Sequence, residues 1–82
     1  MNLYVSNLDY SVQDDGLKNM FSNYGTVTSA KVILDRTTGK SRGFGFVEMP
    51  NKDEAARAMT DLNGSMNEGK SIKVSEARPK AY

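Results

Sequence analysis

The sequence contains no cysteine and no histidine. Without cysteine, the chain can form neither a disulfide nor a thiolate metal site, and without histidine it lacks the commonest general base and metal ligand. Zinc sites and histidine-dependent catalysis are therefore excluded, and we expect no metal, no cofactor and no enzymatic activity. The N-terminus also lacks the features of a signal peptide, and no run approaches the roughly 20 apolar residues of a membrane span. At 82 residues, the chain is expected to form one small domain, a soluble, cytoplasmic monomer with no membrane contact.

The net charge is small, but the charged residues are unevenly distributed along the chain. The net charge is only +1, yet acidic residues are in excess in segments 1–30 and 48–69, and basic residues in segments 31–47 and 70–82. The acidic segments contain the predicted helices, whereas the basic segments contain predicted strands, a loop and the C-terminal tail. This pattern is typical of a surface that binds nucleic acid. Solvated faces that happen to differ in charge explain it equally well when it is taken alone.

Apolar residues recur with helical spacing in two stretches of the chain. Each set falls at positions i, i+3, i+4 and i+7, which predicts a helix with one buried face. The two sets are Leu17, Met20, Phe21 and Tyr24, and Ala55, Ala58, Met59 and Leu62. The first helix is expected to begin between Ser11 and Asp14 and to end at Gly25. The second is expected to begin at Asn51, with Glu54 completing a capping box, and to end at Asn63 and Gly64.

Four β-rich segments surround these helices. They lie at residues 3–5, 27–34, 43–49 and 71–76, where β-branched, aromatic and alternating apolar residues favour strands. The predicted order is β-α-β followed by β-α-β, which makes this an α+β protein. Two helices with one apolar stripe each can cover only one face of a four-stranded sheet.

The segment Arg42 to Val47 reads R-G-F-G-F-V. Because side chains alternate along a strand, Arg42, Phe44 and Phe46 share one face and the intervening small or apolar residues share the other. The covered face is predicted to hold Leu3, Val5, Val32, Gly43, Gly45, Val47, Ile72 and Val74. The uncovered face then carries Tyr4, Phe44 and Phe46, with Ile33 nearby. An exposed aromatic patch of this kind indicates a partner, and flat rings beside a cation suit unstacked nucleic-acid bases.

These residues resemble the signature of the RNA recognition motif family. Its longer signature, K/R-G-F/Y-G/A-F-V-x-F/Y, matches residues 42–47, with Glu48 at the free position. Met49 departs from the final aromatic, but alternation places it on the helix side, where it affects packing more than binding. The shorter signature matches L-Y-V-S-N-L at residues 3–8. The resemblance extends over almost the whole chain. Among members of the family, the chain resembles the small proteins of bacteria and organelles that contain a single such domain.

The resemblance implies a fold and a set of contact residues. The fold is a ferredoxin-like sandwich with a four-stranded antiparallel sheet and both helices on one face, formed by residues 1–80 and followed by a tail at 81–82. Tyr4 and Phe44 would stack on bases, Phe46 would lie against sugars, and Arg42 would contact phosphate. Further contacts are expected on the outer strands, in the basic loop 36–41 and in the tail. They are Lys31, Lys40, Lys73, Ser75, Ala77 and Arg78.

The resemblance therefore predicts a module that binds single-stranded RNA and acts as an RNA chaperone or post-transcriptional regulator. Two alternatives remain open at this point: binding of single-stranded DNA, and a protein-interaction module on the same fold. Arg42 favours nucleic acid over protein, because a sheet adapted to protein contact has no need of a cation beside its rings.

Overall fold

A computed structural model describes residues 1–77 of the chain, apart from the side chain of Asn67. The predicted domain end at residue 80 and the tail at 81–82 lie outside the described residues. The main elements are β1 (Asn2–Ser6), α1 (Asp14–Ser22), β2 (Ser29–Leu34), β3 (Ser41–Glu48), α2 (Lys52–Leu62) and β6 (Lys73–Glu76). Between α2 and β6 lie two short strands, β4 (Met66–Asn67) and β5 (Lys70–Ser71).

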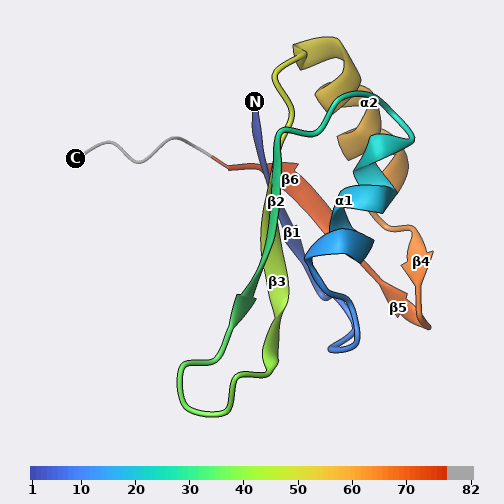
Figure 1. Ribbon diagram of the computed structural model, residues 1–82. Coiled ribbons are helices and arrows are strands. Elements are labelled where there is room, and N and C mark those ends of the chain that lie inside the picture. Colours follow the sequence, from blue (N-terminus) through green and yellow to red (C-terminus); the bar gives the residue numbers. More distant parts are fainter. Residues whose placement is uncertain (78–82) are drawn as a thin grey trace.

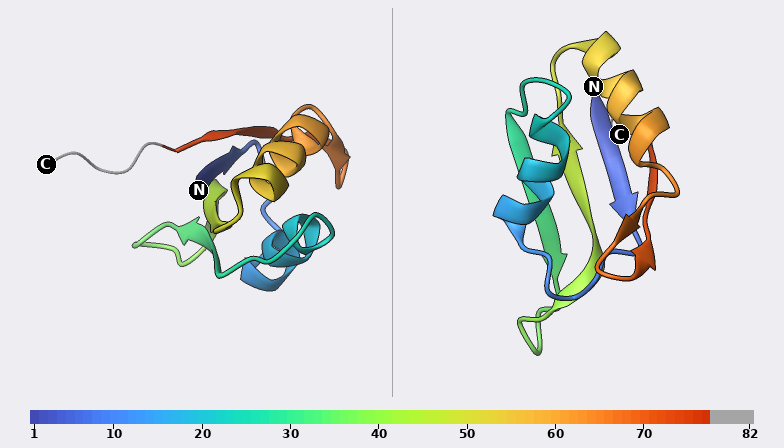
Figure 2. Two further views of the ribbon diagram at one scale, coloured as in Figure 1. Left: turned by 90° about the horizontal axis from the view of Figure 1, so that it is seen from above. Right: turned by 90° about the vertical axis from the view of Figure 1, so that its right-hand side faces the viewer.

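The main sheet has four strands in the order β2-β3-β1-β6, and every neighbouring pair is antiparallel. Both helices pack on one face of this sheet, and the opposite face carries neither of them (Figures 1 and 2). The predicted ferredoxin-like sandwich is therefore confirmed. In the part of the chain that the structure describes, no helix is long and apolar enough to cross a membrane.

The core lies between the sheet and the helices. The eight residues that were predicted to face the helices are all buried, and they pack against Leu17 and Phe21 of α1 and Ala55 and Ala58 of α2. Met49 is also fully buried, as its position in the alternating pattern predicts. Strand alternation therefore sorts the side chains correctly onto the two faces of the sheet.

The helix ends follow the predicted caps in part. α1 begins at Asp14, inside the predicted range, but ends at Ser22, before Gly25. At α2 the Asn51 side chain accepts a hydrogen bond from the Glu54 amide at 3.0 Å, which is the predicted N-cap. The Glu54 carboxylate does not complete the capping box. It accepts instead a hydrogen bond from the Thr26 amide at 3.2 Å. This bond connects α2 to the segment before β2.

Polar side chains from the helix layer also bind the outer strands. The Asp14 carboxylate accepts from the Val32 amide of β2 at 2.7 Å, and the Asn63 side chain accepts from the Val74 amide of β6 at 3.1 Å. Outer strands carry backbone groups that a neighbouring strand would otherwise pair. These contacts satisfy two such backbone amides, one at each outer edge of the sheet.

Several local features of the strands differ from the prediction, and β3 spans Ser41–Glu48 rather than 43–49. β2 begins at Ser29 rather than Val27. The last predicted strand is interrupted at Ile72, because its first part pairs with β4 in a separate hairpin. The pairing of β2 with β3 shifts register, since Val32 lies opposite Gly45 but Leu34 lies opposite Ser41. This irregularity places extra residues in β3 around Gly43, whose φ is +84°, a value that favours glycine.

Candidate nucleic-acid interface

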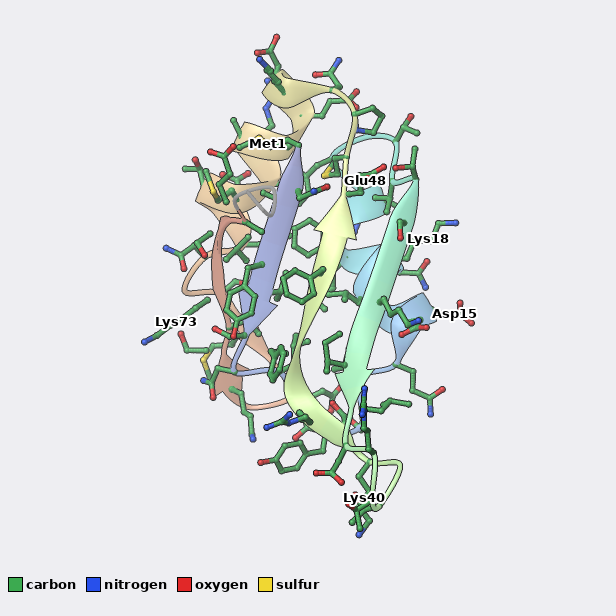
Figure 3. All side chains as sticks on the ribbon, turned by 90° about the vertical axis from the view of Figure 1, so that its left-hand side faces the viewer. Met1, Asp15, Lys18, Lys40, Glu48 and Lys73 are labelled. Carbon is green, nitrogen blue, oxygen red and sulfur yellow. The ribbon has the colours of Figure 1, made fainter. Side chains whose placement is uncertain are left out.

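Three aromatic rings gather at the centre of the open face, the sheet surface opposite the helices (Figure 3). Tyr4 on β1 lies directly opposite Phe46 on β3, and the neighbouring pair is Ser6 and Phe44. The Tyr4 ring centroid is 5.8 Å from that of Phe44 and 5.4 Å from that of Phe46. Both contacts are tilted and lie within the usual range for aromatic pairs. We call Tyr4, Phe44 and Phe46 the ring cluster.

The ring cluster is accessible to a partner. Phe46 is 41% exposed, and Tyr4 and Phe44 are each half-buried by their neighbours. Rings of this size on the side of the sheet that has no helix cannot be explained by the core. They offer apolar ring surface to a ligand.

Cationic and polar side chains surround the rings. The Arg42 guanidinium carbon lies 5.7 Å from the Phe44 ring centroid, within the distance at which a cation and a ring attract each other. Lys31 on β2 lies opposite Phe46. On the other side, Lys73 and Ser75 of β6 lie opposite Ser6 and Tyr4. All four of these side chains are exposed, so the rings are flanked by groups that can bind phosphate or bases.

The loop between β2 and β3 is ordered by Asp35. Its carboxylate accepts hydrogen bonds from the amides of Thr38 at 3.0 Å and Thr37 at 2.8 Å. These bonds, Thr38 first, lower the pKa of Asp35, and the charge of Arg42 lowers it further. Lys40 lies in this loop at one end of the sheet, beyond the ring cluster (Figure 3).

The structure thus brings seven of the nine residues of the predicted site to one face. These are Tyr4, Lys31, Arg42, Phe44, Phe46, Lys73 and Ser75. Lys40 extends from the loop at the end of the sheet, and Arg78 lies outside the described residues. Ala77, named with them, is held by a hydrogen bond from its amide to the Asn2 carbonyl at 2.8 Å.

Sequence reasoning did not select Tyr10 and Lys70. The Lys70 ammonium nitrogen lies 4.6 Å from the centroid of the Tyr10 ring, and Tyr10 is 66% exposed. Tyr10 carried a signal that could have been used, since it is an aromatic residue in a polar loop outside both helical stripes. Lys70 carried only its place in the basic segment 70–82, because the contact between the two residues joins distant parts of the sequence.

The family assignment is decided by a family model. The model of the RNA recognition motif matches residues 3–73, which include both signature strands and both helices. The chain belongs to the RNA recognition motif family. The match spans this RNA recognition motif from β1 to the first residue of β6.

Individual relatives support the same assignment. RbpE of Nostoc sp. (strain PCC 7120) is 46% identical over 80 residues, which cover 98% of this chain and 81% of RbpE. The 29 kDa chloroplastic ribonucleoprotein of Arabidopsis thaliana is 47% identical over 75 residues, or 92% of this chain. This chain spans only 22% of that ribonucleoprotein and 11% of polyadenylate-binding protein 5 from the same plant. The domain therefore occurs both in small proteins and within much longer ones.

Solved structures agree in fold and in sequence. The crystal structure of RNA Binding Protein PG1 superposes with a TM-score of 0.92 at 49% identity, covering 98% of this chain and 99% of that one. A Sex-lethal protein bound to RNA superposes with a TM-score of 0.90 at 34% identity, covering 98% of this chain and 48% of that one. The structures similar to this chain thus include one that was solved as a complex with RNA.

Proposed function

We propose that this RNA recognition motif binds single-stranded RNA on its open face and catalyses no reaction. The observation that carries the proposal is the ring cluster, three adjacent aromatic rings on the sheet face that bears no helix, with the Arg42 guanidinium beside Phe44. Unpaired bases present flat faces that stack on such rings, and phosphates take up the adjacent positive charge.

Each residue of the interface has a distinct role in this proposal. Tyr4 and Phe44 each stack on one base, and Phe46 lies against the sugars between them. Arg42 binds a phosphate. Lys31, Lys73 and Ser75 contact the RNA as it crosses the outer strands, and Lys40 and Arg78 add charge from the loop and the tail. Two stacked bases at roughly 1 to 3 kcal/mol each, with a few phosphate contacts, correspond to a dissociation constant in the micromolar range, about −8 kcal/mol.

At the level of the cell, the proposal is an RNA chaperone or post-transcriptional regulator that holds unpaired segments open. The monomeric state, the cytoplasmic location and a domain that ends at residue 80 remain predictions. Single-stranded DNA is the nearest competing ligand, because stacking alone does not read the 2′-hydroxyl that distinguishes RNA.

The direct test is an amide NMR titration with degenerate RNA and DNA pools of the same length. We expect shifts concentrated on β1, β3 and the outer strands of the open face, with the exposed surfaces of α1 and α2 unaffected. Tighter binding of the RNA pool is expected from contacts to the 2′-hydroxyl. Shifts confined to the helix surfaces, or an absence of shifts with both pools, would contradict the proposal.

Replacing Arg42 by glutamine should weaken RNA binding for all sequences alike. Because Arg42 is proposed to release one counterion from the RNA, the slope of log affinity against log salt should fall by about 0.7. Arg57→Gln on α2 is the matched control, since Arg57 is exposed on the helix layer and carries the same charge. The measurement is fluorescence anisotropy at several salt concentrations. An unchanged slope, or an equal loss in both variants, would remove Arg42 from the contacts.

A further inference from the structure

Tyr10 is held in place on the surface next to the open face. Its loop is attached to β3 by a hydrogen bond from the Leu8 amide to the Gly43 carbonyl at 2.8 Å. The Asn7 side chain donates to the Ser71 carbonyl at 2.7 Å and so attaches the same loop to β5. The ring packs against Gly43, where an added Cβ would lie 3.3 Å from Tyr10 Cε1. The Tyr10 ring is therefore exposed and held in position by its neighbours, so that it can contact a ligand without rearrangement.

Lys70 is also held near this ring rather than extending freely into solvent. Its ammonium nitrogen lies 4.6 Å from the Tyr10 ring centroid, a distance that permits a cation–π attraction. The Asp9 carboxylate lies nearby and accepts hydrogen bonds from the side chain and amide of Ser11. These bonds lower the pKa of Asp9, and the charge of Lys70 contributes to the same effect. Lys70 thus brings a positive charge to the hollow beside the open face, and the Asp9 carboxylate near it is not among the residues that line that hollow.

A shallow hollow joins this pair to the ring cluster. Its lining includes Tyr4, Ser6, Tyr10, Arg42, Phe44 and Lys70. At about 230 Å³, it is smaller than pockets that enclose a ligand, which usually exceed roughly 300 Å³. It suits part of a chain that lies across the surface, because its lining includes two cations, Arg42 and Lys70, and aromatic rings from both the ring cluster and the β1–α1 loop.

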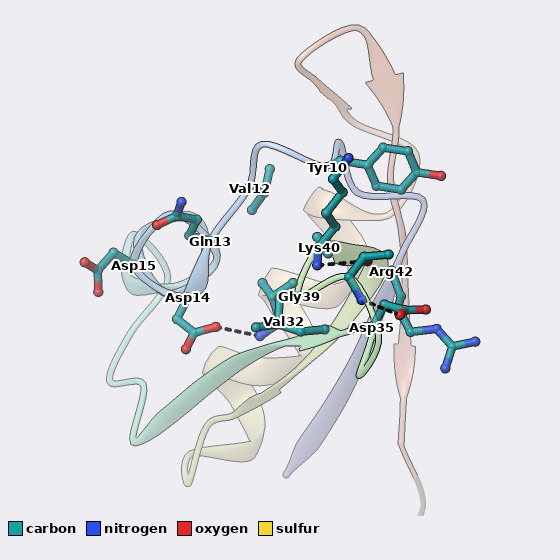
Figure 4. A pocket seen from close by; sticks show the side chains of 13 residues that line it. Tyr10, Val12, Gln13, Asp14, Asp15, Val32, Asp35, Gly39, Lys40 and Arg42 are labelled. Atoms are coloured by element: carbon teal, nitrogen blue, oxygen red, sulfur yellow. Dashed lines mark hydrogen bonds between the residues drawn. The ribbon is translucent and has the colours of Figure 1, made fainter.

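A larger groove on the other side of Tyr10 is less suited to RNA. It measures about 960 Å³ and runs between the β2–β3 loop and the start of α1. Asp14, Asp15 and Asp35 line it together with Lys40 and Arg42 (Figure 4). The groove thus has three carboxylates against two cations, whereas the residues that line the hollow include two cations and no carboxylate, so the hollow is the more favourable site for a phosphate. A chain that leaves Phe44 toward Tyr10 is therefore favoured on the Lys70 side.

We propose that the hollow between Phe44 and Tyr10 is an additional nucleotide subsite, which takes the nucleotide that follows the one stacked on Phe44. In this subsite the base or sugar lies against Tyr10, and the phosphate is bound between Arg42 and Lys70. This proposal rests on the proposed function, because it assumes that RNA occupies the ring cluster. It extends the binding surface past the end of the sheet through residues of the β1–α1 loop and the β4–β5 hairpin.

The test compares degenerate RNA pools of increasing length, from about three to about eight nucleotides, by amide NMR titration. For each length, the dissociation constant of a variant is divided by that of the wild type, so that the greater number of binding registers on longer RNA cancels. For Tyr10→Ala the ratio should be about 1 with the shortest pool and rise to about fivefold or more with longer ones. Lys70→Gln should follow the same course, and with long RNA its salt slope should fall by about 0.7.

Two controls separate the subsite from simpler explanations. Lys18→Gln removes the same charge from the exposed surface of α1, and its ratio should stay near 1 at every length. Tyr10→Leu keeps apolar bulk against Gly43 but removes the aromatic ring, so it reports on stacking even where Tyr10→Ala disturbs the loop. Thermal unfolding of each variant identifies a change in stability.

The outcomes distinguish this proposal from the proposed function. If wild-type protein binds and Phe44→Ala weakens binding at every length, while the Tyr10 and Lys70 ratios stay near 1, the subsite is wrong and the proposed function stands. Ratios for Lys70→Gln that are equal at all lengths also overturn the subsite, since they indicate a general charge effect. If the wild type binds no pool, the proposed function itself fails.

Discussion

Gly45→Ala should destabilise the domain by about 3 kcal/mol, the upper part of the usual cost of overpacking. A Cβ at this position would lie 2.5 Å from the Lys31 carbonyl oxygen and 3.1 Å from the Val32 Cα, both backbone atoms of β2. It would also lie 2.9 Å from Cδ2 of Leu17, which is fully buried in α1. None of these groups can move without separating β2 from β3 or α1 from the sheet.

The matched control is Gly16→Ala. A Cβ at Gly16 would meet only Val12 Cγ1 at 3.7 Å, an ordinary contact. Because Gly16 lies within α1, alanine should stabilise the domain, by up to about 1 kcal/mol. Urea unfolding followed by circular dichroism measures both changes. If Gly45→Ala is as stable as the wild type, the close approach of the β2 backbone and of Leu17 to Gly45 is incorrect.

This glycine explains why the R-G-F-G-F-V segment predicts so much of the fold from residue order alone. Alternation along β3 places Phe44 and Phe46 on one face and Gly45 between them on the other, where Leu17 packs against it. Close packing behind the strand and aromatic rings in front of it are therefore two sides of one pattern. A period of two is a local property of any strand, so the sequence was sufficient to predict both.

The features that the sequence did not predict depend on contacts between distant segments. The register shift near Gly43 arises where β3 pairs with β2 and also accepts a hydrogen bond from the Leu8 amide. The strands β4 and β5 have two residues each, too few for a periodic pattern. The Tyr10 and Lys70 pair forms only after the hairpin and the β1–α1 loop come together. Such tertiary contacts leave no trace in spacing or composition.

The helix ends show the same difference between local contacts, which could be predicted, and contacts with distant segments, which could not. The N-cap of α2 was predicted because Asn51 and Glu54 interact within one turn. The Glu54 carboxylate was assigned incorrectly, since its partner is the amide of Thr26, which precedes β2. Local hydrogen bonds could thus be inferred from residue type, whereas a competing partner from another segment could not.

Phe44→Ala should weaken RNA binding by roughly 1 to 3 kcal/mol, which is about fivefold to more than a hundredfold, while the domain stays folded. The reason is that the Phe44 ring is half-exposed on the open face, and its neighbours there are Tyr4 and the Arg42 guanidinium. Anisotropy with a degenerate RNA pool measures the affinity, and urea unfolding measures the stability.

Phe21→Ala is the contrasting control, because it should reduce stability, whereas Phe44→Ala should reduce RNA binding. Phe21 is fully buried in α1, so Phe21→Ala should cost about 3 to 5 kcal/mol of unfolding free energy. For Phe44→Ala we expect most of the loss to appear in RNA binding and little in stability. If Phe44→Ala instead destabilises the domain as strongly as Phe21→Ala and leaves RNA affinity unchanged, the ring cluster is part of the core and not a binding surface.

Tyr4 extends this test to the ring cluster as a unit. Its ring contacts both Phe44 and Phe46, so Tyr4→Ala should remove one stacking surface and also release the other two rings from their positions. The binding losses of Tyr4→Ala and Phe44→Ala should therefore not add in the double variant, as is usual for residues in direct contact. Strict additivity would indicate that each ring binds RNA independently, and that the tilted packing around Tyr4 does not position its neighbours.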